Sequence, residues 1–403
     1  MANPPRDTDF PVFGLALALS LGAAVSLGIT RFAYGLLLPP MRADLQWSYT
    51  LAGAMNTANA LGYLLGALVT PRLMRRFGPS LLLLWGSALA SLFMGLSGFF
   101  TDAAALLAQR VLAGTASAFL FIAGGLLAAR LGSLYPARSG LLLGLYYGGT
   151  GFGIALSALL VPVVLRVVAG QAHGWAWAWW ALSLACFAAT AMLLWPARAL
   201  RQLAQAAPLA QTQDAELFRW RDFTPALAGY TMFGVGYIGY MTFVIALLRE
   251  QGVGQARVTM FYALLGLAVV ASSRIWAALL DRARAGGALA VLNALLGVAT
   301  IVPALTAAWP ALLLSGLVFG AVFLSVVAST TALVRHNLPP GQWVAGISAF
   351  TIVFAGGQII GPTVVGWIAD GEGGLARGLV FSALALWTGA LLAWRQQPRG
   401  ALT

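Results

Sequence analysis

Apolar segments long enough to cross a bilayer recur along almost the whole chain. A hydrocarbon core about 30 Å thick needs about 20 apolar residues in helical conformation. Of the 403 residues, 60% are hydrophobic and 8% are charged, whereas soluble domains carry about a quarter charged residues. Lipid must therefore be the main solvent of this chain. We predict an all-α polytopic membrane protein with twelve transmembrane helices, at residues 12–38, 48–70, 80–100, 103–130, 139–168, 175–195, 225–248, 257–280, 287–308, 310–334, 343–369 and 375–394.

One polar segment interrupts this pattern. Residues 196–224 are rich in Gln and Arg, whereas the other connections are short. We therefore predict a six-helix half at residues 1–195, a linker at 196–224 and a second six-helix half at 225–403. Cytoplasmic loops of membrane proteins are enriched in positive charge. With the amino terminus inside, fifteen arginines fall on the cytoplasmic side and five on the outer side, so both termini and the linker are predicted to be cytoplasmic.

The charge and the reactive residues exclude several classes of function. A formal net charge of +12 would indicate nucleic-acid binding in a soluble protein, but in a membrane protein it is typical of loops held at the cytoplasmic face. The chain has one cysteine and two histidines, and it shows no HExxH motif and no cluster of acids that would indicate an enzyme or a metal site. We predict no enzymatic activity, no cofactor, no metal and no nucleic-acid partner.

The short loop after the second predicted span carries a family motif. The stretch PRLMRRFGP is similar to the G-x-L-x-D-R-x-G-R-R loop of the major facilitator superfamily. Leu73, Arg76 and Gly78 match that pattern, whereas Pro71 stands for its glycine and Arg75 for its aspartate.

Other segments carry the same resemblance. In the second half, AALLDRARAGG keeps Asp281 and Arg282 of that loop. The stretch QRVLAGTASA resembles the R-x-x-x-G element of the family's fourth span, with Arg110 and Gly114 in place. Together with six plus six spans around a long central loop, these motifs resemble the major facilitator superfamily over nearly the whole chain.

The resemblance extends to one branch of that superfamily and implies a function. GQIIGPTVVGWIAD is similar to the G-P-containing eleventh helix, and RFAYGLLLPPM followed by NTANALGYLLGAL resembles the bacterial YbfB/YjiJ-type branch. The resemblance implies a secondary active or facilitative transporter of the bacterial inner membrane, which works by alternating access around a midplane site. We expect a monomer whose partners are a small-molecule substrate and the lipid bilayer. The residues that it implicates in gating are Arg76, Gly78, Asp281, Arg282, Gly361 and Pro362.

Three arginines fall inside predicted spans, although Arg costs about 2.5–3.5 kcal/mol at the centre of a membrane helix. From a rise of about 1.5 Å per residue, Arg31 and Arg110 lie about 12 Å and 10 Å from the outer surface. Arg274 lies about 10 Å from the cytoplasmic face by the same measure. All eleven acids fall in tails, loops or span ends. The arginines thus lack a carboxylate partner within the spans, and we hypothesise that they hold an anionic substrate.

Each of these arginines also has a structural alternative. Arg31 could extend toward the outer surface or bind carbonyl groups near the double proline that follows it. Arg110 could have the conformational role of the family's fourth-span arginine. Arg274 could pair with Asp281, two helical turns away.

Aromatic and amide side chains would complete a binding site. Tyr237 and Tyr240 follow helical spacing in the seventh span, with packing between helices as the alternative. Phe32 and Tyr34 flank Arg31, and Gln358 either lines the cavity or bonds between helices. The predicted substrate-binding residues are Arg31, Phe32, Tyr34, Arg110, Tyr237, Tyr240, Arg274 and Gln358.

These residues favour a transporter of a small organic anion or an amphipathic metabolite. The alternative is an efflux transporter for neutral or lipophilic drugs and metabolites. The absence of a mid-span acid favours an anion that brings its own proton, exchange of anions, or facilitated movement, because Arg stays charged in proteins. The weaker possibility is a proton carrier at a span end, namely Asp44, Glu250 or Asp281.

Overall fold

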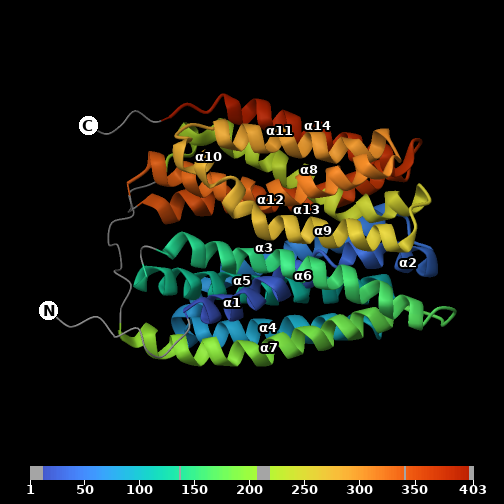
Figure 1. Cartoon of the computed structure of the whole chain (residues 1–403), viewed down its shortest axis with the longest axis horizontal. Helices are drawn as coiled ribbons and strands as arrows, with labels where there is room; N and C mark the ends of the chain where they lie inside the picture. Colours follow the sequence, from blue (N-terminus) through green and yellow to red (C-terminus); the bar gives the residue numbers. More distant parts are fainter. Residues whose placement is uncertain (1–11, 136–137, 207–217, 340–341, 399–403) are drawn as a thin grey trace.

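Long helices aligned along one axis make up the molecule (Figure 1). The computed structural model describes residues 12–135, 138–206, 218–339 and 342–398, and no strand is present in these stretches. In Figure 1 the first half of the chain, blue to green, lies against the second half, yellow to red. The predicted all-α polytopic fold is confirmed.

The first half consists of a broken first pass followed by five helices. Its elements are α1 (Val12–Ala23), the π-helix η1 (Ala24–Ile29), α2 (Tyr34–Leu45), α3 (Tyr49–Phe77), α4 (Pro79–Ser97), α5 (Ala103–Leu134), α6 (Ser139–Val167) and α7 (Trp175–Ala206). We call the end of the bundle where α2 finishes and α3 begins the α2 end. We call the opposite end, where α7 finishes, the linker end.

The second half begins with a short 3₁₀ turn. Its elements are η3 (Trp220–Phe223), α8 (Thr224–Glu250), α9 (Gln255–Ile275), α10 (Ala277–Arg282), α11 (Gly287–Leu305), α12 (Trp309–Asn337), α13 (Trp343–Ala369) and α14 (Gly374–Trp394).

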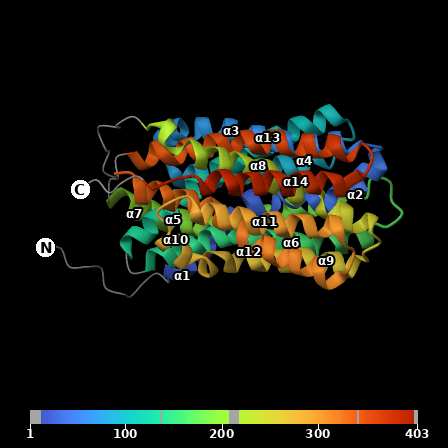
Figure 2. The ribbon, with the colours of Figure 1, turned by 90° about the horizontal axis from the view of Figure 1, so that it is seen from above.

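Within the described stretches, eleven helical segments are long and apolar enough to cross a membrane. The remaining predicted span is α3, whose hydropathy is lowered by Asn56, Thr57 and Asn59. The polar face of this helix is covered by protein, because α3 packs against α5 in its own half and against α13 of the other half, as Figure 2 shows for α13. Asn56 and Asn59 are both buried. The polar side chains of α3 therefore face other helices and need not meet lipid.

Local residues explain why the connections between these helices are so short. The side chain of Ser48 accepts a hydrogen bond from the amide of Leu51 and caps the start of α3. The backbone of Gly78 adopts φ 78° and ψ 162°, a conformation that favours glycine. Gly78 is the single residue that joins α3 to α4.

Two of the helix boundaries that differ from the prediction concern the linker and Arg274. The predicted linker begins at residue 196, but α7 continues to Ala206, and residues 207–217 lie outside the described part. The predicted span 257–280 is interrupted at Trp276, because α9 ends at Ile275 and the separate helix α10 follows. Arg274 therefore lies in the last turn of α9.

Cysteine labelling should show which end of the bundle faces outward. In a Cys186→Ala background, an impermeant maleimide added to intact cells should label Gln171→Cys, since Gln171 is exposed in the loop between α6 and α7. The same reagent should label Gln205→Cys in the last turn of α7 only after the membrane is permeabilised. The reverse pattern would contradict the predicted orientation.

Candidate functional site

The first pass is broken beside Arg31. Residues 24–29 form a π-helix, residues 30–33 form a turn, and α2 begins at Tyr34. The amide of Phe32 donates to the carbonyl of Leu27 at 3.1 Å, a spacing of five residues. Single π-turns within membrane helices occur frequently at functional sites, and broken helices line the binding sites of transporters.

Side chains from other helices bind two carbonyl groups at the break. The carbonyl of Thr30 accepts from Arg110 Nη1 at 2.7 Å. The carbonyl of Phe32 accepts from the hydroxyl of Tyr262, in the other half, at 2.7 Å. Close packing also shapes the break, because a Cβ on Gly28 would lie 2.5 Å from the carbonyl oxygen of Thr150. The conformation is therefore fixed by tertiary contacts.

Arg31 itself is a buried cation whose guanidinium has no bonding partner among the described residues. Its side chain is 3% exposed, and its Nε and Nη2 atoms are buried with no hydrogen-bond partner. In the part of the chain that the structure describes, no hydrogen bond or ion pair to the Arg31 guanidinium is found. Burying a charge in this way is unfavourable unless another group compensates it.

Arg110, by contrast, is fully engaged in the first half. Besides its bond to Thr30, its Nε donates to the carbonyl of Met55 at 3.3 Å and its Nη2 donates to Asn56 Oδ1 at 3.0 Å. Its guanidinium also lies 5.2 Å from the ring centre of Tyr34. Arg110 thus ties α5 to the broken first pass and to α3, which fits the conformational alternative.

Aromatic side chains of the second half form a stacked wall around Tyr237, which lies within electrostatic range of Arg31. The Tyr237 hydroxyl donates to Gln358 Oε1 at 2.8 Å, which joins α8 to α13. The Tyr237 ring stacks on Phe354 of α13 and Phe323 of α12, with ring centres 5.6 Å and 6.0 Å away. Phe32 meets Phe323 edge-on at 5.8 Å, across the two halves.

Two tyrosines extend this wall toward the guanidinium. Tyr63 of α3 and Tyr237 both lie within electrostatic range of Arg31. The structure therefore brings together Arg31, Phe32, Tyr237 and Gln358 of the predicted residues. The sequence did not predict three of these aromatic residues, Tyr63, Phe323 and Phe354. In the sequence they differ from other span residues only in being aromatic and on an inward-facing side of a helix.

Three other predicted binding residues lie elsewhere. The Tyr34 hydroxyl donates to the carbonyl of Ala52 at 2.8 Å within the first half. Tyr240 is hydrogen-bonded to Ser315 at 2.7 Å inside the second half. Arg274 is exposed in the last turn of α9, and no ion pair among the described residues joins it to Asp281.

The predicted gating residues divide between the linker end and the interface. Arg76, Asp281 and Arg282 are exposed at the linker end, where Gly78 supplies the turn described above. Gly361 packs against α8, because a Cβ there would lie 2.6 Å from the carbonyl of Val235. The carbonyl of Pro362 lies so close to Gly53 of α3 that no side chain fits between them.

A hydrogen-bonded contact closes the α2 end. The Oδ1 of Asp370, just after α13, accepts from the amide of Tyr49 at 2.6 Å, and its Oδ2 accepts from the amide and hydroxyl of Thr50 at 2.8 Å and 2.6 Å. The Tyr49 hydroxyl also donates to the carboxylate of Glu250 at the end of α8. We call these four residues the α3 latch: Tyr49, Thr50, Glu250 and Asp370.

Asp370 remains ionised in this contact. Partial burial raises the pKa of its carboxyl. Hydrogen bonds from the hydroxyl and amide of Thr50 and from the amide of Tyr49 lower this pKa by a larger amount, so the net shift of the pKa is downward. The negative charge sits at the amino terminus of α3, where the helix dipole favours it.

Further hydrogen bonds join the halves just below the latch. Asn56 Nδ2 donates to Thr242 Oγ1 at 2.8 Å, and Thr57 Oγ1 donates to the carbonyl of Ile359 at 2.7 Å. Among the described residues, the side-chain hydrogen bonds between the halves all lie at the α2 end or at the level of Arg31. The structure is thus closed at the α2 end.

Comparisons with known proteins agree with this architecture. A family model described as "Uncharacterised MFS-type transporter YbfB" matches residues 23–394. No curated protein matches the chain significantly.

Three solved structures with the same fold illustrate the range of similar proteins. A bacterial homolog to the human lysosomal transporter Spinster, in an inward-facing and unoccupied conformation, is 14% identical, with a TM-score of 0.72 and coverage of 96% of this chain and 97% of that chain. The human organic anion transporter MFSD10 (TETRAN) is 17% identical, with a TM-score of 0.65 and coverage of 96% and 100%. The nucleoside transporter NupG is 12% identical, with a TM-score of 0.65 and coverage of 96% and 99%. These likenesses concern the fold.

Proposed function

Because the chain belongs to the YbfB-type family of major facilitator transporters, we propose that it moves a small organic anion across the membrane by alternating access. Arg31 binds the anion in this proposal. The protein is a multi-pass membrane protein of a transporter family. Its placement in a bacterial inner membrane, with both termini cytoplasmic and as a monomer, belongs to the same proposal.

The observation that carries the proposal is the unpartnered guanidinium of Arg31. Nε and Nη2 are buried and donate to nothing in the described protein. The acids of the described part lie at helix ends or in loops, so none is available at this depth. A carboxylate substrate would supply both the negative charge and two parallel acceptors.

The surroundings of Arg31 indicate an organic anion. Phe32 and Tyr237 both pack against Phe323, and Tyr237 lies within electrostatic range of Arg31. These rings suit an apolar or aromatic body. The amide of Gln358, bonded to Tyr237, adds a polar group. One of the structures of this fold belongs to an organic anion transporter, which shows that the fold can serve this class of substrate.

Alternation requires that the two ends open in turn. In the state described here, the α3 latch and the contacts below it separate Arg31 from the α2 end. Release of the latch, together with closure at the linker end, would expose Arg31 to the opposite side. Gly53 and Pro362 allow close approach of α3 and α13 in the state described here.

The aromatic stack favours one second candidate, efflux of neutral or lipophilic compounds. Tyr230, Phe233, Tyr237 and Phe354 stack on one another, with ring centres 4.7 to 5.6 Å apart. Such a surface could bind an uncharged planar compound without Arg31. The two candidates differ in whether the charge of the substrate matters.

Counterflow exchange in proteoliposomes tests the proposal. A panel of labelled monocarboxylates should exchange, whereas matched neutral amides and cationic amines should not. The Arg31→Gln variant should lose at least tenfold of anion exchange below saturation, since a charged hydrogen bond contributes about 1.5–3 kcal/mol. Arg274→Gln should retain it, because Arg274 is exposed at the end of α9. Equal exchange of neutral compounds by the parent and by Arg31→Gln would instead support the efflux candidate.

A further inference from the structure

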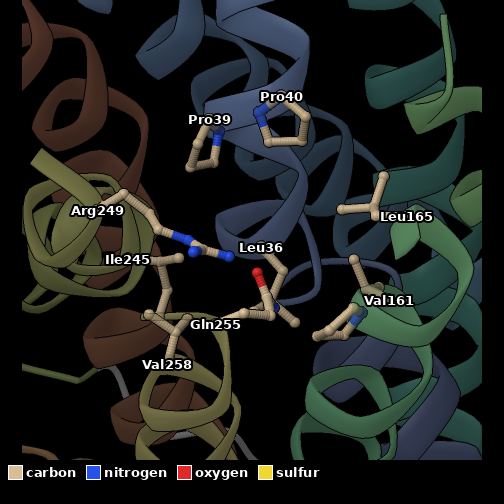
Figure 3. A pocket seen from close by; sticks show the side chains of 10 residues that line it. Leu36, Pro39, Pro40, Val161, Leu165, Ile245, Arg249, Gln255 and Val258 are labelled. Carbon is tan, nitrogen blue, oxygen red and sulfur yellow. The ribbon is translucent and has the colours of Figure 1, made fainter. Parts of the chain in front are cut away.

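A cavity of about 330 Å³ lies between the two halves at the α2 end. Leu36 and Pro39 of α2 and Val161 of α6 line it from the first half, and Ile245 and Arg249 of α8 line it from the second. Figure 3 shows the side chain of Arg249 extending into this space, with Gln255 of α9 directed toward it from below. Arg31 is not among the residues that line the cavity.

The polar groups in the cavity have no partners of their own. Arg249 is half-buried, and neither Arg249 nor Gln255 makes a hydrogen bond or ion pair with any residue that the structure describes. No acid lines the cavity, and the carboxylate of neighbouring Glu250 is bound to Tyr49.

The start of α9 adds to the positive potential. This helix begins at Gln255, its N-cap Gly254 provides no side-chain acceptor, and its first turn contains no acid. The amide groups at the amino terminus of a helix attract anions. A guanidinium, a carboxamide and a helix amino terminus therefore converge on one side of the cavity, opposite walls of aliphatic side chains and prolines.

We propose that this cavity binds an amphiphilic anion, with its charged group on Arg249 and Gln255 and its apolar body against Leu36, Pro39 and Val161. The volume equals that of about ten water molecules, which suits a chain of about eight carbons. A dissolved fatty or aromatic acid and the phosphate of an anionic lipid share this chemistry. The inference goes beyond the proposed function and does not depend on Arg31.

Binding is measured in the Arg31→Met background, so that the transport site proposed above cannot contribute. The protein is placed in nanodiscs of phosphatidylcholine, and octanoate is titrated calorimetrically, with octanol as its neutral counterpart. Octanoate should bind and octanol should bind at least tenfold more weakly. Arg249→Gln should raise the Kd for octanoate at least tenfold.

Two further variants test the position of the ligand. Arg257→Gln removes an equal charge from the same end of α9, but the Arg257 guanidinium lies over the ring of Trp309 at 5.6 Å, so the Kd should change less than twofold. Leu165→Trp would fill the cavity from α6 and should abolish octanoate binding. Because Leu165→Trp leaves Arg249 in place, it tests the site even where Arg249→Gln does not fold.

Native mass spectrometry of the detergent-purified protein distinguishes the sources. Retention of phosphatidylglycerol that is lost in Arg249→Gln would identify a lipid as the ligand, and octanoate binding without such retention would identify a dissolved acid. The proposal is wrong if neither probe binds. It is also wrong if Arg257→Gln weakens binding as much as Arg249→Gln does, or if Leu165→Trp binds octanoate normally.

Discussion

Replacing Arg31 by Met should raise the melting temperature of the protein, whereas the same replacement at Arg110 should lower it. Arg31 is a buried cation whose Nε and Nη2 lack partners, so an apolar side chain of similar length relieves an uncompensated charge. Removing Arg110 leaves the carbonyls of Thr30 and Met55 and the Oδ1 of Asn56 without their donor. Unsatisfied buried acceptors cost about 1–3 kcal/mol each.

The two shifts should be large enough to separate cleanly. In a unit of 150–250 residues, 1 kcal/mol moves the Tm by about 2–4 °C. We expect Arg110→Met to lose at least about 5 °C and Arg31→Met to gain about 2–4 °C on the same scale. Tryptophan fluorescence during heating in one detergent measures both. If Arg31→Met melts as early as Arg110→Met, Arg31 is held by protein groups and the anion proposal loses its basis.

Breaking the α3 latch at Asp370 should open the α2 end. Asp370→Ala removes three hydrogen bonds from the start of α3. Ser48 still caps the helix in this variant, but hydrogen bonds to a charged group contribute about 1.5–3 kcal/mol. The ratio of open to closed molecules should therefore rise at least tenfold.

The measurement is the labelling rate of a cysteine placed below the latch. Met241→Cys, in a Cys186→Ala background, substitutes a residue that is 1% exposed and packs against Gly35. An impermeant maleimide should label it at least tenfold faster when Asp370→Ala is added. Glu372→Ala is the matched control, because it removes an exposed acid two residues away. An unchanged rate in Asp370→Ala would show that the latch does not hold the closed state.

The latch should also be insensitive to pH across the physiological range. The pKa of Asp370 is lower in the closed state than its ordinary value. The stabilisation of the latch by the Asp370 carboxylate is therefore fully present when the pH lies above that ordinary value. The contribution is lost only as the pH falls through the lowered pKa. Protonation of Asp370 should thus not alter the labelling rate of Met241→Cys between pH 5 and 8. An acid that stays ionised over this range is unsuitable as a proton carrier.

The sequence predicted the span pattern because apolar length is a local property of the chain. It also singled out Arg31, since a charge within an apolar run is visible without any structure. The α3 latch could not be predicted, because Tyr49 and Asp370 are 321 residues apart and each looks like an ordinary residue at a helix end. The aromatic residues Phe323 and Phe354 were missed for the same reason.

Arg274 shows what the sequence does not reveal about the end of a helix. A rise of about 1.5 Å per residue holds only for a continuous helix. The predicted span ran to residue 280, but α9 ends at Ile275 and Trp276 separates it from α10. Arg274 therefore lies in the last turn and is exposed. Nothing in the stretch SSRIWAALLDR distinguishes this break from a regular helix, because no proline or glycine marks it.

The π-helix η1 affects how relatives of this chain should be aligned with it. A π-turn holds one residue more than an α-turn, and one residue corresponds to about 100° of rotation. A relative whose first pass is a regular α-helix would therefore need a one-residue gap between Ala24 and Ile29 before its side chains superpose on those of this chain. Without that gap, Arg31 would be matched to a position that faces a different neighbour, and a shared arginine would be overlooked.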